Sequence, residues 1–248
     1  MSAASGQREP SVRSSSPRLA LVTGASSGIG AATALALAEA GWSLLLHGRD
    51  RGRSEASERA VARALSVDAT VGVRVADLTQ EGAVEELVAA VGERELHALV
   101  HAAGVVRLGS VADSPVGVLD EHLALNLRAP YALTHALLPA LRSGHGHVVM
   151  VNSTAGKRAN ARWSSYAASK FALRALADSL RQEEPELRVT SVYPGRTATP
   201  MQATVHESEG IEYDPERFVR PEAVAAQIVA LLELPRPSLV HEVTVGPG

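Results

Sequence analysis

The chain has 248 residues, of which 46% are hydrophobic and only 3% aromatic, so a single α/β domain with a core of Ala, Val and Leu accounts for its length. The 24 basic and 27 acidic residues give a net charge of −3 without any basic run, which argues against nucleic acid as a partner. The sequence has no cysteine, which excludes disulfides and thiolate metal sites, and no apolar run approaches the ~20 residues of a membrane span.

Residues 1–17 are rich in serine, contain two prolines and lack the apolar centre of a secretion signal. This composition predicts a disordered tail. Residues 18–248 are expected to form the single folded domain. In the absence of a signal or a membrane span, we expect a cytoplasmic protein.

Short apolar runs alternate with helical patterns from residue 18 to residue 245. This rhythm predicts a parallel sheet of about seven strands in a doubly wound α/β fold, with helices on both faces of the sheet. The expected strands are 18–22, 42–47, 69–76, 96–100, 146–151, 187–192 and 239–245. The expected helices are 31–40, 51–66, 81–91, two stretches within 115–141, 171–180 and 222–232.

The turn after the first expected strand reads Gly24-Ala-Ser-Ser-Gly28-Ile-Gly30. Glycines in a strand-to-helix turn let the backbone approach a pyrophosphate, and the amino end of the following helix offers unpaired N–H groups and a positive dipole. The spacing differs from the commoner G-x-G-x-x-G, but its position predicts a dinucleotide site. Ligands of such sheets bind at the carboxyl ends of the strands, where Asp77 and Gly104 also fall.

Arg49 lies just past the second expected strand, where the ribose of a bound adenosine usually sits. An arginine there favours a 2′-phosphate, whereas a carboxylate favours a 2′-hydroxyl, so we expect NADP(H) rather than NAD(H). The alternative is that Arg49 is a solvated loop charge. We expect Asp50 to cap the next helix and Asp77 to meet the adenine edge.

Tyr166 and Lys170 lie four residues apart in a segment expected to be helical, so both lie on one helix face. A free tyrosine ionises near pKa ~10, and a fixed ammonium nearby lowers the pKa by favouring the phenolate. The pair therefore predicts a general acid or base tuned toward neutral pH. Alone, the same spacing also fits a packed ring beside a solvated amine.

With these parts in place, the sequence from residue 18 to residue 245 resembles the short-chain dehydrogenase/reductase family, in its compact branch of about 250 residues. The resemblance rests on the turn ending at Gly30, the 13-residue interval from Ser153 to Tyr166, the Tyr166-x-x-x-Lys170 pair, and Pro194-Gly195 with Thr199. It implies a Rossmann-type domain, a homodimer or homotetramer, and an enzyme that interconverts a carbonyl and a secondary alcohol by hydride transfer.

The resemblance also implies roles for four residues. Tyr166 exchanges a proton with the substrate oxygen, and Ser153 hydrogen-bonds that oxygen and orients it. Lys170 holds the nicotinamide ribose and lowers the pKa of Tyr166. Asn126, a weak helix former that hints at a kink or a bonded water, supports a water that links Lys170 to bulk solvent.

The cofactor-binding residues that the resemblance implies lie at several strand ends and in the catalytic helix. They are Gly24, Ser26, Ser27, Gly28, Ile29, Gly30, Arg49, Asp77, Leu78, Ala102, Gly104, Tyr166, Lys170, Pro194, Gly195, Thr197 and Thr199.

One turn departs from the family pattern, because His101-Ala-Ala-Gly104 stands where Asn-Asn-Ala-Gly is common. We expect His101 to be a structural substitute rather than a catalytic base. Residues 196–221 show no helical pattern, and we expect residues 196–220 to be an irregular substrate lid. The basic side chains at Lys157, Arg158, Arg162 and Arg196 suggest an acidic substrate.

Three alternatives remain from the sequence. Gly24-Ala-Ser26-Ser-Gly28 also matches the G-x-S-x-G turn of a serine hydrolase with Ser26 as its nucleophile. A protein that binds NADP(H) without turnover, as a sensor or scaffold, is the second. A metal site at His145-x-His147 is the third and is not expected, since this pair lies at a strand entrance far from the catalytic end.

Overall fold

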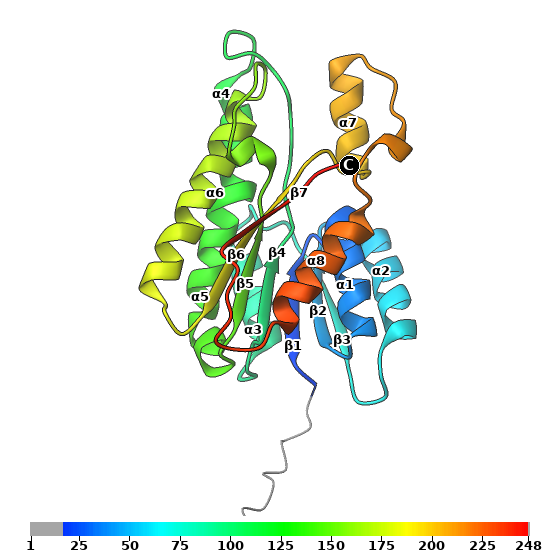
Figure 1. The fold of residues 1–248 in the computed structure, drawn as a ribbon, viewed down its shortest axis with the longest axis vertical. Coiled ribbons are helices and arrows are strands. Elements are labelled where there is room, and N and C mark those ends of the chain that lie inside the picture. Colours follow the sequence, from blue (N-terminus) through cyan, green and yellow to red (C-terminus); the bar gives the residue numbers. More distant parts are fainter. Residues whose placement is uncertain (1–16, 248) are drawn as a thin grey trace, which may run out of the picture.

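The computed structural model describes residues 17–247. Except for residue 17, the predicted disordered tail lies outside the described residues. A seven-stranded sheet in the order β3-β2-β1-β4-β5-β6-β7 runs through the protein, and every pairing is parallel (Figure 1). The strands are β1 (Leu19–Thr23), β2 (Ser43–Gly48), β3 (Val71–Val75), β4 (Ala98–His101), β5 (His147–Val151), β6 (Arg188–Pro194) and β7 (Glu242–Val245).

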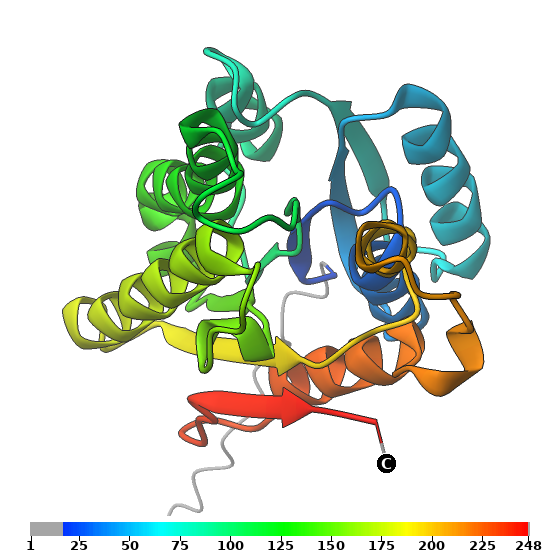
Figure 2. The ribbon, with the colours of Figure 1, turned by 90° about the horizontal axis from the view of Figure 1, so that it is seen from above.

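Helices cover both faces of this sheet, which confirms the predicted doubly wound fold. The face formed by α1 (Gly28–Glu39), α2 (Arg51–Ala64) and α8 (Pro221–Glu233) lies opposite the face formed by α3 (Ala83–Val91), α5 (Ala129–Ser143) and α6 (Ser164–Glu183) (Figure 2). Successive side chains of a strand point to opposite faces. Leu19 and Leu21 of β1 accordingly join the core under α3, α5 and α6, while Ala20 and Val22 join the core under α1 and α8.

The strand order reverses between β1 and β4, because the chain extends the sheet first through β2 and β3 and then, from β4 on, in the other direction. In open α/β sheets a crevice forms at the carboxyl ends of the strands where the order reverses. The turns after β1, β4 and β5 therefore open on the same crevice.

The segment from residue 196 to residue 221 is more regular than predicted. It contains α7 (Pro200–Glu209) and a 3₁₀ turn at Pro215–Arg217. Local signals explain the helix, because the Thr199 hydroxyl accepts a hydrogen bond from the backbone N–H of Gln202 at 3.2 Å and Pro200 occupies the first helical position. Gly210 ends α7 with a φ of 68°. The prediction that this segment is irregular was therefore wrong.

A π-helical turn at Ala124–Arg128 joins α4 (Val116–Leu123) to α5. The weak helix former Asn126 lies in the middle of this turn, at the place where the sequence predicts a kink or a bonded water. A π turn holds one residue more than an α-helical turn, and such turns are common at functional sites.

Candidate functional site

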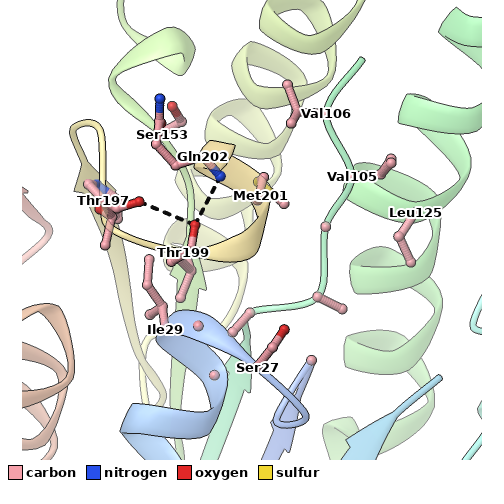
Figure 3. Close-up of a pocket in the computed structure, with 18 of the residues that line it drawn as sticks. Ser27, Ile29, Val105, Val106, Leu125, Ser153, Thr197, Thr199, Met201 and Gln202 are labelled. Carbon is pink, nitrogen blue, oxygen red and sulfur yellow. Dashed lines mark hydrogen bonds between the residues drawn. The ribbon is translucent and has the colours of Figure 1, made fainter. Parts of the chain in front are cut away.

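A cavity of about 570 Å³ opens at the carboxyl ends of the strands, between the glycine turn after β1 and α7 (Figure 3). Every residue predicted to bind the cofactor lines this cavity, as does Ser153. Of the four residues predicted to be catalytic, Asn126 alone is absent from the lining. The fold therefore brings the predicted residues together around one cavity, and the contacts described below bear on their individual roles.

Tyr166 and Lys170 lie on one face of α6 and are almost fully buried, with exposed fractions of 7% and 4%. The Lys170 ammonium donates a hydrogen bond to the carbonyl oxygen of Val151 at 3.0 Å and lies 5.9 Å from the centre of the Tyr166 ring. The ammonium is thus anchored to the end of β5, on the floor of the cavity.

The electrostatic effect predicted for this pair differs from what the structure shows. Burial raises the pKa of Tyr166, with the Ser153 side chain acting in the opposite direction, and burial lowers the pKa of Lys170 to about 8. The prediction that Lys170 lowers the pKa of Tyr166 was wrong for this arrangement, because the low-polarity surroundings penalise both charged forms. Helical spacing predicts that two residues share a face, but not how far both are removed from water.

Ser153 begins a 3₁₀ turn, Thr154–Gly156, that packs against α6. Its hydroxyl accepts a hydrogen bond from the backbone N–H of Ala155 at 3.1 Å. The amide of Asn152 links this turn to α6, since its oxygen accepts from the Ser153 N–H at 2.9 Å and its nitrogen donates to the Lys170 carbonyl at 3.1 Å. These hydrogen bonds therefore fix the position of Ser153 relative to α6, which carries Tyr166 and Lys170.

Asn126 is 1% exposed and joins three elements through its side chain. Its oxygen accepts from the N–H of Val105 at 2.9 Å, and its nitrogen donates to the Val105 carbonyl at 3.1 Å and to the Ser169 hydroxyl at 3.0 Å. A Cβ atom added to Gly104 would lie 3.2 Å from the Asn126 oxygen and 3.9 Å from the Lys170 nitrogen. Because Gly104 has no side chain, both polar groups can lie close to its backbone.

The glycine turn fits a dinucleotide. Gly24 has a φ of 67°, and an added Cβ would lie 2.7 Å from the backbone nitrogen of Ala103; at Gly30 the added Cβ would lie 2.3 Å from the Gly24 carbonyl oxygen. Backbones this close leave no room for side chains. Ser27 precedes α1 and makes no capping hydrogen bond to it, so the first amide groups of the helix remain available to an anion such as a pyrophosphate.

Two arginines line the end of the cavity near β2. Arg49 was predicted there, whereas Arg53 was assigned only to the expected helix 51–66. The Asp50 carboxylate caps α2 by accepting from the Arg53 N–H at 2.8 Å, as predicted. This cap places the first turn of α2, and with it Arg53, beside the cavity. The sequence feature that could have predicted Arg53 at the cavity is its position four residues after Arg49, about one helical turn away.

Asp77 lines the same end, but its carboxylate is already engaged. It accepts from the N–H and the hydroxyl of Thr79 at 3.0 and 2.7 Å. Burial alone raises the pKa of Asp77, but the Thr79 hydrogen bonds and the charge of Arg49 outweigh it, so the pKa lies below its usual value. The carboxylate is therefore charged at neutral pH, and the positive charge of Arg49 favours this charged form.

The unusual turn after β4 is satisfied by Thr23. Its hydroxyl accepts hydrogen bonds from the backbone N–H groups of Ala102 and Ala103 at 3.1 and 3.2 Å. His101 lies outside the cavity, where its ring shares a hydrogen bond of 2.8 Å with the Thr134 hydroxyl and burial lowers its pKa to about 3. This arrangement agrees with the predicted structural role of His101.

Two aromatic neighbours of Tyr166 were not predicted. His122 and Trp163 both meet the Tyr166 ring edge to face, with ring centres 5.8 Å apart in each case. The fully buried His122 donates from Nδ1 to the Val118 carbonyl at 2.7 Å and accepts at Nε2 from the Arg107 N–H at 3.0 Å. No spacing rule marks a single histidine inside a helix, so the sequence carried no signal for this contact.

The other predictions from the sequence concern single residues and absences. Within residues 17–247, the side chain of Ser26 makes no hydrogen bond to a histidine or carboxylate that would activate it as a hydrolase nucleophile. His147 bonds the Thr190 hydroxyl at 2.8 Å, and the described residues contain no group of three side chains suited to a metal ion. None of the described helices has the length and apolar character to cross a membrane.

Comparisons with known proteins agree with this geometry. A family model described as "short chain dehydrogenase" matches residues 18–210. An uncharacterized oxidoreductase of Staphylococcus saprophyticus is 30% identical over 93% of this chain and 97% of its own length. An alcohol dehydrogenase of the archaeon Thermococcus sibiricus, solved with 5-hydroxy-NADP, is 26% identical with a TM-score of 0.84, over 93% of this chain and 96% of its own. A metagenomic short-chain oxidoreductase solved with NADP is 30% identical with a TM-score of 0.78, over 93% and 97%.

Proposed function

Because the chain belongs to the short-chain dehydrogenase family, we propose that it is an NADP(H)-dependent oxidoreductase that interconverts a carbonyl and a secondary alcohol. Two structural neighbours that were solved with NADP or a derivative of it support the choice of cofactor class. Arg49 and Arg53 support NADP(H) over NAD(H), because two guanidinium groups at one end of the cavity suit a 2′-phosphate.

The residues that would hold the dinucleotide lie along the whole length of the cavity. Arg49, Asp77 and Leu78 would hold the adenosine, and the turn from Gly24 to Gly30 would hold the pyrophosphate. Ala102 and Gly104 would leave room beside the adenosine half, and the segment from Pro194 to Thr199 would hold the nicotinamide. The bound cofactor supplies or accepts the hydride.

Tyr166 is the proposed general acid and base at the substrate oxygen. Its buried phenol stays protonated at neutral pH in the structure described, which suits proton donation to a carbonyl during reduction. Ser153 hydrogen-bonds the same oxygen and orients it. His122 and Trp163 restrict the ring of Tyr166 through their edge-to-face contacts.

Lys170 and Asn126 complete the proposed site. With a pKa of about 8, Lys170 is mostly an ammonium at neutral pH and can hold the ribose hydroxyls. We retain for Asn126 the support of a water that links Lys170 to bulk solvent. Its bonds to Val105 hold the neighbouring wall of the cavity.

The segment from residue 196 to residue 220 is proposed as the substrate lid, built around α7. Arg196 at its start is joined to Glu209 near the end of α7 by two hydrogen bonds of 2.8 and 2.6 Å. By family likeness we also propose a homodimer or homotetramer, and from the sequence a cytoplasmic location.

The observation that carries the proposal is the placement of Ser153, Tyr166 and Lys170 in the cavity that the glycine turn also lines. The test is NADPH oxidation over a panel of ketones, keto acids and sugars, with Tyr166→Phe as the variant. Turnover should fall by at least about a hundred-fold, the usual contribution of a positioned acid or base, while NADPH affinity stays nearly unchanged. NADPH binding without oxidation of any panel member would instead favour a sensor or scaffold.

A further inference from the structure

The substrate half of the cavity, beyond Ser153, has a largely apolar wall. Val106, Ala155, Tyr166 and Val205 form one buried cluster, with Leu108 and Trp163 packed against it. Figure 3 shows Val105, Val106 and Leu125 along one side of the cavity, across from Ser153. Such a wall suits the hydrocarbon body of a substrate.

The charges that line the cavity are divided between its two ends. The carboxylates among the lining residues are Asp50 and Asp77, and both lie at the adenosine end, near β2 and β3. The charged residues that line the substrate half are Lys170, Arg196 and Arg158. The substrate half therefore presents positive charge without a carboxylate among its lining residues.

Most cations around this half are already engaged. Lys170 is bonded to Val151, and Arg196 is paired with Glu209. Lys157 forms an ion pair of 3.0 Å with Glu242 and lies over the Tyr193 ring.

Two further arginines, which do not line the cavity, also have structural partners. Arg107 is paired with Glu121 at 2.9 Å. Arg162, with a φ of 68°, reaches the Ser208 carbonyl on α7 at 3.4 Å, and its own carbonyl accepts from the Gly109 N–H at 2.8 Å. Arg162 thus ties together the loop before α6, the loop before α4 and α7.

Arg158 differs from all of these residues. It lines the cavity, and its guanidinium has no ion pair and no side-chain hydrogen bond to any residue between 17 and 247. Its backbone N–H donates to the Thr154 carbonyl at 3.1 Å, so it belongs to the turn that starts at Ser153. The arginine and the serine hydroxyl are therefore carried on one short element.

We propose that Arg158 binds the carboxylate of the substrate, and that the substrate is a keto acid or hydroxy acid with an apolar body. The planar guanidinium matches a carboxylate with two parallel hydrogen bonds. The carbonyl then lies at Ser153 and Tyr166, and the hydrocarbon lies against Val106 and Trp163. This inference rests on the proposed function, since it describes the substrate of the same site.

The first experiment compares aliphatic keto acids of increasing chain length with their methyl esters, using NADPH and the unmodified protein. The expected kcat/KM is at least about ten-fold higher for the acid than for its ester at the best chain length, a factor that corresponds to about 1.4 kcal/mol. Arg158→Ala should remove this preference by lowering kcat/KM for the acid alone, and Arg158→Lys should keep part of it. Arg158→Glu should reverse the preference toward carbonyl compounds that carry an amine.

The matched control is Arg162→Ala. Because this guanidinium bonds α7 and does not line the cavity, its loss should change acid and ester to the same extent. An equal effect of Arg158→Ala on acid and ester would overturn the inference, as would equal kcat/KM values for acid and ester in the unmodified protein. In both cases the proposed oxidoreductase function would stand.

A binding measurement separates the inference from the function. Calorimetric titration with a saturated alkanoate, which has no carbonyl to reduce, should show binding that Arg158→Ala abolishes and that Arg162→Ala preserves. Absence of alkanoate binding to the unmodified protein contradicts the inference even if ketones are reduced. Binding without reduction of any carbonyl compound would preserve the anion site and reject the proposed function.

Discussion

The two halves of the cavity differ in the groups that form them, which are mainly backbone in one half and side chains in the other. The adenosine half is made from backbone at the ends of β1, β2 and β4, where Gly24 and Gly30 allow segments to approach too closely for a side chain. The substrate half is made from side chains on loops and on α7, held by ion pairs such as Arg196–Glu209 and by aromatic contacts around Tyr166. A backbone-built half tolerates little change, whereas a side-chain-built half can be altered to suit another substrate without rebuilding the sheet.

The sharpest contrast is between Gly30 in the first half and Gly41, which follows the far end of α1 and does not line the cavity. Gly30→Ala places a methyl group 2.3 Å from a backbone oxygen, so we expect a loss of more than about 4 kcal/mol or a failure to fold, together with loss of NADPH binding. Gly41→Ala has a φ of 81° but nothing within 4 Å, so strain alone should cost about 1–2 kcal/mol and NADPH affinity should not change. Thermal unfolding and NADPH titration measure both effects, and equal losses would contradict the assignment of Gly30.

Lys170→Met should separate stability from activity. Burial lowers the pKa of Lys170 to about 8, so the folded protein binds its proton less tightly than the unfolded chain does. Burial of the charged ammonium therefore lowers the stability of the fold. This loss of stability is fully present below pH 8 and is relieved as the pH rises from about 8 toward 10.5, the ordinary pKa of lysine. The variant should therefore raise the free energy of unfolding at pH 7 by up to about 3 kcal/mol, while turnover falls by orders of magnitude.

The control for Lys170→Met is the pH dependence of the gain in the free energy of unfolding. Urea unfolding at pH 7 and at pH 9.5 should show a smaller gain at the higher pH. The raised pKa of Tyr166 does not disturb this comparison, because its phenol is protonated in the folded state across that range. A gain that does not change with pH would show that Lys170 is not desolvated as described.

Removal of either arginine near β2 should change the choice of cofactor rather than the chemistry. Arg49→Ala and Arg53→Ala should each weaken NADPH binding by about ten-fold, an effect typical of a charge-assisted hydrogen bond, and leave NADH binding nearly unchanged. The measurement is the ratio of the two affinities. An Arg49→Ala variant with an unaltered KM for NADPH would reject the assignment to NADP(H).

The smallest expected effect concerns His122 in the second half. His122→Leu removes the acceptor for the Arg107 N–H and should raise KM by several-fold, and it should lower the free energy of unfolding by about 1 kcal/mol, the usual contribution of one hydrogen bond. His122→Gln can still offer an oxygen and should recover most of the KM. The two variants should differ in KM more than in kcat, and a loss confined to kcat would indicate a direct role for His122 in proton transfer.

The difference between backbone and side chains also explains which features the sequence could predict. The sheet, its helices and the glycine turn were predictable because apolar runs and glycines indicate the conformation of the backbone. The position of the cavity at the carboxyl ends of the strands follows from those elements. The proposed catalytic residues were predicted from spacing and family resemblance, and all except Asn126 line the cavity.

What sequence patterns could not supply was the surroundings of individual side chains. The pKa directions of Tyr166 and Lys170 depend on burial from several elements at once, and spacing along one helix does not report on burial. The contact of His122 with Tyr166 joins residues 44 positions apart in the numbering of the chain. The helix α7 was missed for another reason, since Thr199, Pro200 and Gly210 are ordinary start and stop signals that its polar composition obscured.

The π turn at Ala124–Arg128 amounts to one extra residue inserted into an otherwise continuous helix. One residue of an α-helix corresponds to a rotation of about 100° about the axis. Deleting a residue such as Leu125 would therefore restore a straight helix and turn the face of α4 that carries His122 away from Tyr166. The variant would keep its helical content and lose the contact between His122 and Tyr166, so the extra residue sets the direction in which His122 faces.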